Sequence, residues 1–489
     1  MKKWTIFICI FVVLVLGLIV VVKNKSEQCN LTSYNQILIY DDQRQILEGK
    51  EEVCFFNYTD NALTQLWLHL YPNAFRQGAK AKVVSLSNYE KAYPNGISYG
   101  NITIETVSYC DDYLEYEIAG EDENILNITI PELYPEETIT FEIGFSCQLP
   151  NINHRFGYGE NTINLGNYYP IMCVYENGEF KDDMYYSNGD PFYSKIADYS
   201  VSITYDESFV LASTGEQKTT IKDGRKTTNI SAKNVRDFAM VLSNKFDAIC
   251  DEYDNINIRY YYYEDENSDE IITLIKEVLD FNKRYGKYPY NELSVVKANF
   301  VHGGMEFPQM VLISDVLSDR DTYINVVVHE LCHQWWYGVV GNDEVNFGFL
   351  DEGLTDYTTA RFYDYYSKYN HTSTEIFENA TRSYANFVKV YGDVKQNFST
   401  NMIRPLGDFE TENEYVYISY VKGMLMFASL QDLLGQKKID SCLKYYYDCN
   451  KFSECKPDDL VDAFNKSCGK NLTKFFDSWF NGEVVMGEF

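Results

Sequence analysis

Residues 326–336 read VVVHELCHQWW and contain the pattern His-Glu-x-x-His. On an α-helix, His329 and His333 lie one turn apart on the same face, so both imidazoles can bind one metal ion. The apolar run that leads into the pattern predicts a buried helix over about residues 323–338. Buried histidines need strong polar partners, and a metal ion supplies one partner to both. The stretch therefore predicts a metal site on a buried helix.

A third ligand is predicted on the helix that follows. A catalytic zinc site takes three protein ligands and keeps one position open. Residues 349–357 read FLDEGLTDY, and Glu352 in this stretch can supply the third ligand. Glu330, next to the first histidine, is placed to act as the general base. We therefore predict one Zn²⁺ per chain, bound by His329, His333 and Glu352.

Strand patterns dominate the first half of the chain. From about residue 35 to 245, short alternating runs such as residues 102–106 are separated by turn residues. Beyond about residue 265, apolar residues recur at helical spacing, and the rest of the chain is mostly helical apart from short strands. The predicted fold is α+β and multidomain, with an N-terminal β-sandwich-like domain followed by an α/β-to-helical domain.

The length of the chain limits the number of domains, and its net charge limits the kinds of partner. At 489 residues the chain exceeds one ordinary core, and we place the β-sandwich-like domain at 29–247 and the catalytic domain at 248–489. The formal net charge is -30, from 42 Lys+Arg against 72 Asp+Glu. Nucleic acid is not expected as a partner, because phosphate binding needs cationic neutralisation. The acidity fits a solvated surface or a negative cleft that attracts peptide amino termini, and composition does not separate the two.

The N-terminal segment, residues 1–28, predicts a membrane anchor and its flank. Residues 4–22 are apolar apart from Thr5, which is just long enough for a helix to span a bilayer. No small-residue cleavage site follows, so an uncleaved anchor is favoured over a signal peptide. We therefore expect a membrane protein with a single N-terminal span and an extracytoplasmic body. The crowded C-terminal cysteines, Cys442, Cys449, Cys455 and Cys468, favour local disulfides in an oxidising compartment, with buried reduced thiols as the alternative.

Several motifs together resemble the M1 family of zinc aminopeptidases, the gluzincin group. The resemblance covers the chain from about residue 35 to the end and implies a thermolysin-like catalytic domain. It rests on the combination of Gly-Gly-Met-Glu, His-Glu-x-x-His and the later glutamate. The family-like landmarks begin at His69 (HLYPNAF), Val235 (VRDFA), Tyr285 (YGKYPY), Gly303 (GGMEFP), Tyr420 (YVKG) and Phe476 (FDSWF).

The resemblance implies roles for residues that spacing alone does not assign. Gly303, Gly304, Met305 and Glu306 would form an edge strand that pairs with the substrate backbone. Glu306 would hold the free α-amino group of the peptide. Tyr420 would donate a hydrogen bond to the oxyanion that develops during peptide hydrolysis.

Three departures separate the chain from the family pattern. Phe307 stands where the family usually has asparagine, as in a bacterial-type branch. The Gln-containing segment that helps bind the substrate amine is not evident, and residues 164–169 are the nearest candidate. The chain ends at Phe489, soon after Tyr420, so we expect a short member without the large C-terminal helical arm.

Three functions are compatible with these motifs. The first is a membrane-anchored zinc aminopeptidase that acts on peptides with free N-termini. The second is a zinc endopeptidase, since the missing glutamine segment and short C-terminus would open the cleft. The third is a non-catalytic surface module that keeps the fold, although Glu330 and Tyr420 have no purpose in a purely structural site. We favour the aminopeptidase.

Overall fold

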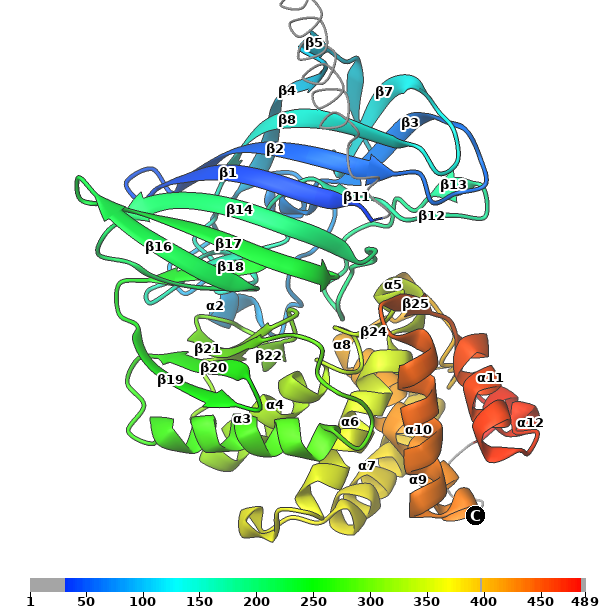
Figure 1. The fold of residues 1–489 in the computed structure, drawn as a ribbon. Coiled ribbons are helices and arrows are strands. Elements are labelled where there is room, and N and C mark those ends of the chain that lie inside the picture. The colour runs from blue at the N-terminus through cyan, green and yellow to red at the C-terminus, as the bar shows by residue number, and fades with distance from the viewer. Residues whose placement is uncertain (1–30, 396–397, 485–489) are drawn as a thin grey trace, which may run out of the picture.

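The computed structural model describes residues 31–395 and 398–484, which form a β-rich part and a mixed, mainly helical part (Figure 1). The β-rich part comes first in the chain and holds three larger sheets and the two-stranded sheet β12-β13. The second part holds a five-stranded sheet and then a succession of helices. The predicted α+β fold class is therefore confirmed.

The largest sheet has eight strands in the order β16-β17-β14-β1-β2-β8-β4-β5. Neighbouring strands in this sheet are antiparallel, except that β1 and β14 pair in parallel. Side chains along β1 and β14 alternate between buried and more accessible positions, as the two-residue period of a strand requires. The strands are β1 (Ser33–Asp41), β2 (Ile46–Phe56), β4 (Asn101–Tyr109), β5 (Asp112–Tyr113), β8 (Thr138–Gln148), β14 (Ala197–Asp206), β16 (Glu216–Lys222) and β17 (Arg225–Val235).

Two four-stranded sheets, β15-β18-β10-β9 and β11-β3-β7-β6, complete the β-rich part. Leu38, Leu66 and Leu165, one from each of the three sheets, belong to one buried hydrophobic cluster, so the sheets share a core. The strands are β3 (Leu63–His69), β6 (Tyr116–Ala119), β7 (Ile125–Leu133), β9 (Phe156–Tyr158), β10 (Ile163–Gly166), β11 (Ile171–Met172), β15 (Val210–Ser213) and β18 (Ala239–Ser243). Smaller elements are η1 (Tyr71–Phe75), α2 (Tyr89–Ala92), β12 (Tyr175–Glu176) and β13 (Glu179–Phe180).

The sheet of the second part has the order β19-β20-β21-β23-β22. Strands β20, β21 and β23 are parallel, and the short β22 pairs antiparallel with β23 at the edge. Helices α3 and α4 pack on each other, and α4 also contacts β22 and β23. The elements are β19 (Asp247–Tyr253), β20 (Ile256–Tyr262), α3 (Ser268–Asn282), β21 (Glu292–Ala298), β22 (Gly304–Met305), β23 (Met310–Ser314) and α4 (Arg320–Cys332).

The rest of the described chain is mainly helical. It contains β24 (Val340–Asn342), α5 (Glu344–Phe347), α6 (Phe349–Tyr363), η2 (Ser367–Tyr369), α7 (Ser373–Val394), η3 (Leu406–Asp408), α8 (Glu412–Tyr415), the π-helical turn η4 (Val416–Val421), α9 (Lys422–Leu434), α10 (Gln436–Asn450), β25 (Ser453–Cys455), α11 (Pro457–Cys468) and α12 (Thr473–Phe480). The crowded cysteines here, Cys442, Cys449, Cys455 and Cys468, are free thiols.

Helix α4 is shorter than the predicted helix over residues 323–338. It runs from Arg320 to Cys332, with His333 as the C-cap. Tertiary hydrogen bonds hold the following residues in tight turns: the Trp335 indole donates to Gly286 O at 2.9 Å, and the Gln334 side chain accepts from Gln309 N at 2.7 Å. These distant partners outweigh the local helical preference of the stretch.

The two parts are joined by a buried arginine. The Arg236 guanidinium is 1% exposed and donates to Glu454 Oε1 at 2.9 Å, and it also donates to Ser194 O at 2.8 Å and Ser453 O at 3.1 Å. Such a buried ion pair is costly to break from one side, because the remaining charge stays buried without a partner. We propose that the boundary between the β-sandwich-like domain and the catalytic domain lies between residues 247 and 248.

The predicted membrane anchor has no counterpart in the described structure. Across residues 31–395 and 398–484, no helix combines the length and the apolar character that a bilayer span requires. Even α7, the longest helix there, carries charged side chains along its length, including Glu378, Arg382 and Lys389. The prediction of a single-pass protein with an extracytoplasmic body is wrong on this finding, and the run at residues 4–22 lies outside the described residues.

Helices α6 and α9 meet at two glycines, which brings Glu352 close to the turn that carries Tyr420. A Cβ atom on Gly353 would lie 2.6 Å from Gly423 Cα, inside the van der Waals contact distance. Because this contact is between backbones, Gly353→Ala is expected to lower the free energy of unfolding by about 1–3 kcal/mol. The matched control is Gly392→Ala, at an exposed helical position with nothing within 4 Å, which should be neutral or stabilising. Denaturant unfolding of both variants at one zinc concentration measures the difference, and equal stability of the two would contradict the prediction.

Candidate metal centre and peptide cleft

Helices α4 and α6 bring the three predicted ligands together. Nε2 of His329 and Nε2 of His333 lie 3.0 Å apart, and Glu352 Oε2 lies 3.3 Å from the first and 3.1 Å from the second. Within the part of the chain that the structure describes, these atoms form a group of suitable spacing for one metal ion. All three residues are largely buried.

The outer hydrogen bonds of the histidines orient the inner nitrogens. Nδ1 of His329 lies 3.0 Å from Asp356 Oδ1, and Nδ1 of His333 lies 3.2 Å from Trp336 O. Both partners can accept a proton donated by Nδ1, which leaves each Nε2 directed at Glu352 Oε2 and able to bind a metal ion once it is deprotonated. The two inward nitrogens and the carboxylate oxygen lie so close together that a cation, either a proton or a metal ion, must lie between them. The donor set, two imidazoles and a carboxylate, suits Zn²⁺.

The charges around this centre favour an ionised Glu352. Burial alone would raise the pKa of Glu352, yet His333 and His329 lower it to about 2. Burial alone would likewise lower the pKa of His329, while the carboxylates of Asp356 and Glu352 raise it. The carboxylate is therefore anionic at neutral pH, as a metal ligand must be.

Glu330 lies beside the three ligands without being one of them. Its side chain is buried, and Oε2 has no hydrogen-bond partner among the described residues. Burial raises the pKa of Glu330 to about 7 against the opposing effect of His329 and His333. A Cβ atom on Gly304 would lie 2.4 Å from Glu330 Oε1, so only glycine at position 304 lets β22 pass this close to the carboxylate.

The turn η4 presents Tyr420 to the same centre. The hydroxyl of Tyr420 donates to Glu352 Oε1, and its ring stacks on His329 with centroids 6.0 Å apart and planes 11° apart. Burial raises the pKa of Tyr420, and the nearby Glu352 carboxylate raises it further. Tyr420 is thus a neutral hydrogen-bond donor beside the metal ligands.

The edge strand β22 and Glu306 lie on the other side of the centre. Gln334 holds this stretch in place, since its Nε2 donates to Glu306 O at 3.3 Å and to Phe307 O at 3.2 Å. Glu306 is 3% exposed, and its Oε1 has no hydrogen-bond partner among the described residues. Burial raises the pKa of Glu306, and Asp190 raises it further. A buried carboxylate oxygen without a hydrogen-bond partner is stabilised when a cation binds beside it.

Two site residues from the β-rich part were not predicted. Arg155 Nη1 lies 2.7 Å from Asp190 Oδ1, and carboxylate oxygens of Asp190, Glu306 and Glu352 lie within 4.8 Å of one another. The only sequence signal near them is the turn-forming Gly189-Asp-Pro, which marks a loop but no chemistry.

The segment 164–169, the nearest candidate for the missing glutamine segment, does not line the cleft. Asn164 is buried and donates to His154 O at 2.8 Å and to Asn299 O at 2.9 Å. A Cβ atom on Gly166 would lie 2.5 Å from Phe307 Cζ, so Phe307 packs closely against this segment. Phe307, the departure from the family pattern, therefore serves packing between the two parts.

One cavity of about 440 Å³ lies against this site, and His329, Glu330 and Tyr420 are among the residues that line it. The volume is within the range of about 300–1,000 Å³ that is usual for small-ligand sites. Its lining comes from the β-rich part (Asn88, Arg155, Gly189, Asp190), from β22 and the residues before it (Val301, His302, Gly303, Gly304), from α4 and α6 (Asn325, Val326, His329, Glu330, Asp356) and from α8 and η4 (Glu412, Tyr415, Val416, Tyr420).

The catalytic part of the chain is similar to known peptidases. Residues 264–479 match the Peptidase family M1 domain. Leucine aminopeptidase 2-1 of Meyerozyma guilliermondii is 23% identical over 198 residues, which cover 38% of this chain and 30% of the relative. Leucine aminopeptidase 2 of Aspergillus fumigatus is 27% identical over 200 residues, covering 39% and 31%. The chain thus spans about a third of the length of these curated relatives.

Solved structures of similar fold cover nearly the whole chain. The crystal structure of an M1 zinc metallopeptidase from Deinococcus radiodurans matches with a TM-score of 0.64 and 14% identity, covering 93% of this chain and 94% of that one. A mutant of that enzyme bound to a Tyr-Ser-Ala substrate matches with the same TM-score and 13% identity. At these identities the likeness shows the two-domain fold. The family implies a catalytic zinc ion, and the cluster of His329, His333 and Glu352 fits it.

Proposed function

We propose that this chain, which belongs to peptidase family M1, is a zinc-dependent aminopeptidase that removes N-terminal residues from peptides. The observation that carries the proposal is that Glu306 directly follows the edge strand β22 and lies within 4.8 Å of ligand atoms of His333 and Glu352, while Gly304 of the same strand lies against Glu330. A substrate amine held at Glu306 would bring the first peptide bond to the general base. The names of the leucine aminopeptidase relatives support the same activity.

Zinc would be held by His329, His333 and Glu352, and when bound it supplies a Lewis acid that lowers the pKa of water to about 7. Glu330 lines the cavity, its Oε2 has no hydrogen-bond partner among the described residues, and its carboxylate accepts the proton of the attacking water. The same carboxyl group then delivers that proton to the nitrogen of the departing amine.

Tyr420 stabilises the charge that develops on the carbonyl oxygen. Its hydroxyl keeps its proton at neutral pH, because burial raises the pKa of the phenol. The single hydroxyl proton, which Tyr420 donates to Glu352 Oε1 in this structure, turns to the substrate oxygen when the oxyanion forms, and a neutral donor so close to the ligands needs to move only a little. The stacking of its ring on His329 keeps the hydroxyl at the cavity wall.

Glu306 and Asp190 recognise the substrate amine. Arg155 pairs with Asp190 at 2.7 Å and offsets one negative charge of the two carboxylates. Because burial and Asp190 raise the pKa of Glu306, its ionised form depends on a nearby cation, and among the described residues no protein group contacts its Oε1. An ammonium group from the substrate supplies the missing positive charge, and two carboxylates then share its protons.

The test compares peptides with free and with acetylated N-termini, with and without a zinc chelator. Chelator-sensitive cleavage of the free peptides only is the expected result. Equal cleavage of both kinds would replace the proposal by an endopeptidase. Zinc binding at one ion per chain without hydrolysis of any peptide would indicate a non-catalytic module.

Glu306→Gln is expected to lower kcat/KM for free-amine peptides by about a hundredfold, or about 2–3 kcal/mol, because a buried charge partner of the amine is lost. Zinc content, measured by metal analysis, is expected to stay at one ion per chain, since Glu306 is not one of the three ligands. A similar loss of zinc and of activity would show that Glu306 supports the metal instead of the amine.

A further inference from the structure

A second hollow of about 680 Å³ adjoins the peptide cleft. Asn88, Glu412 and Val416 line both cavities, so the two hollows meet at these three side chains. The second hollow is lined mainly by the stretches 82–88 and 409–416 and by Ser187 and Asn188. The three shared side chains therefore lie on the boundary between the peptide cleft and the second hollow.

Glu412 forms a bridge across this boundary. Its Oε2 accepts hydrogen bonds from Ser85 Oγ at 2.7 Å and from Asn88 Nδ2 at 3.2 Å, both from the β-rich part. Its Oε1 lies 3.7 Å from Nδ1 of His302, the residue just before Gly303. We call Ser85, Asn88, His302 and Glu412 the interdomain bridge. Because these donors use the hydrogen-bonding capacity of the Glu412 carboxylate, Glu412 lines the cleft without being available to bind a substrate cation.

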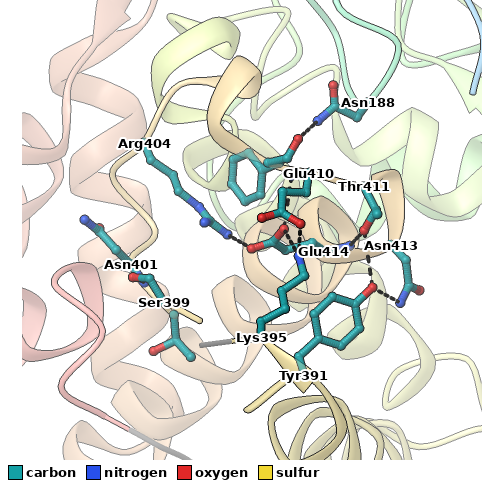
Figure 2. Close-up of polar contacts among 12 residues, drawn as sticks. Asn188, Tyr391, Lys395, Ser399, Asn401, Arg404, Glu410, Thr411, Asn413 and Glu414 are labelled. Atoms are coloured by element: carbon teal, nitrogen blue, oxygen red, sulfur yellow. Dashed lines mark hydrogen bonds and ion pairs between the residues drawn. The ribbon is translucent and has the colours of Figure 1, made fainter. Parts of the chain in front are cut away.

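The helix that carries Glu412 is held firmly. Figure 2 shows Glu414 at the centre of a polar network, where it accepts from Arg404 Nη2 at 2.8 Å and from Lys395 Nζ at 3.2 Å. Thr411 caps α8 by accepting from Glu414 N at 3.1 Å. Asn188 Nδ2 also donates to Leu406 O at 3.1 Å, which ties this region to the β-rich part. These hydrogen bonds hold the short helix α8 and thereby fix the position of Glu412 in the bridge.

The direction of the substrate follows from the proposed function, on which this inference rests. The amine lies at Glu306 and the first peptide bond lies at the metal cluster. A peptide paired with β22 must then continue along the strand away from Glu306, past Gly304 and Gly303. The next residue in that direction is His302, which belongs to the bridge.

We propose that the interdomain bridge closes the cleft a few residues after the cleaved bond, so that the substrates are short peptides, chiefly di- and tripeptides. A longer peptide must displace the bridge to reach the second hollow. The bridge residues are positioning residues that set substrate length and take no part in the chemistry.

The test is a ladder of free-amine peptides of two to eight residues with a common N-terminal dipeptide. For the unaltered protein, kcat/KM is expected to fall at least tenfold from the tripeptide to the octapeptide, mainly through KM. Glu412→Ala should reduce the ratio of kcat/KM between the tripeptide and the octapeptide to about threefold or less. The double variant Ser85→Ala/Asn88→Ala, which removes the partners of Glu412 in the β-rich part, should reduce the ratio in the same way. Glu412→Gln, which keeps the size and an acceptor oxygen, should retain the length preference.

Glu410→Ala is the matched control, because it removes a nearby carboxylate that lines only the second hollow. It should leave the length ratio unaltered. A flat length profile in the unaltered protein, or an unaltered ratio in Glu412→Ala, would overturn the proposal.

Binding of the same peptides to zinc-loaded Glu330→Gln protein separates this proposal from the proposed function. Absence of hydrolysis by the unaltered protein, together with a Kd of the Glu330→Gln protein that still rises with peptide length, would refute the aminopeptidase activity and support the bridge. Hydrolysis of all lengths at equal rates by the unaltered protein, together with a Kd of the variant that does not depend on length, would support the activity and refute the bridge.

Discussion

Glu330→Gln is expected to lower kcat for free-amine peptides by about three orders of magnitude, with zinc still bound at one ion per chain. The amide has nearly the shape of the carboxylate and therefore keeps the close contact with Gly304. It cannot accept a proton, so both the activation of water and the protonation of the leaving amine lose their general base. The steady-state kinetics give kcat, and metal analysis gives the zinc content.

The outcome discriminates between the roles of the acidic residues in the cleft. If Glu330→Gln kept more than a tenth of the activity, Glu330 would not be the base. If it lost its zinc, the carboxylate would belong to the metal site. Glu352→Gln provides the comparison, because Glu352 contacts both histidines and its loss should weaken zinc binding itself.

Tyr420→Phe is expected to lower kcat by about a hundredfold to a thousandfold with little effect on KM. The substitution removes the hydroxyl that would donate to the oxyanion, and the ring can still stack on His329. Because the oxyanion exists only in and near the transition state, its donor contributes to kcat and not to substrate binding. Kinetics with a free-amine tripeptide measure both constants.

Tyr417→Phe is the matched control for this prediction. Tyr417 lies in the same turn η4, stacks on Phe387 with centroids 4.4 Å apart and does not line the cavity. Its substitution should leave kcat within about twofold of the original. Equal activity of Tyr420→Phe and Tyr417→Phe would show that the Tyr420 hydroxyl is not an oxyanion donor. Loss of zinc from Tyr420→Phe would show that it acts through Glu352.

The metal cluster could be predicted because its geometry is local. His329 lies in α4 and His333 is its C-cap, still with helical backbone angles, so the helical repeat places the two residues on one face. The strands were predictable for the same reason, since β4 and β8 contain the alternating runs at residues 102–106 and 139–143. The helix over 323–338 was predicted too long, because Trp335 and Gln334 bond to residues far away in the chain.

The rest of the cleft was decided by the tertiary structure. Asp190 and Glu412 are two of 72 acidic residues, and no local pattern distinguishes them from the solvated majority. Asp190 meets Glu306, and Glu412 meets Ser85, only because the β-rich part packs against the helices. A repeat of three or four residues follows from the backbone alone, whereas a contact between segments hundreds of residues apart depends on the packing of the entire core. The sequence by itself therefore determined the metal cluster, and the tertiary structure decided which residues of the β-rich part meet Glu306 and Glu412 in the cleft.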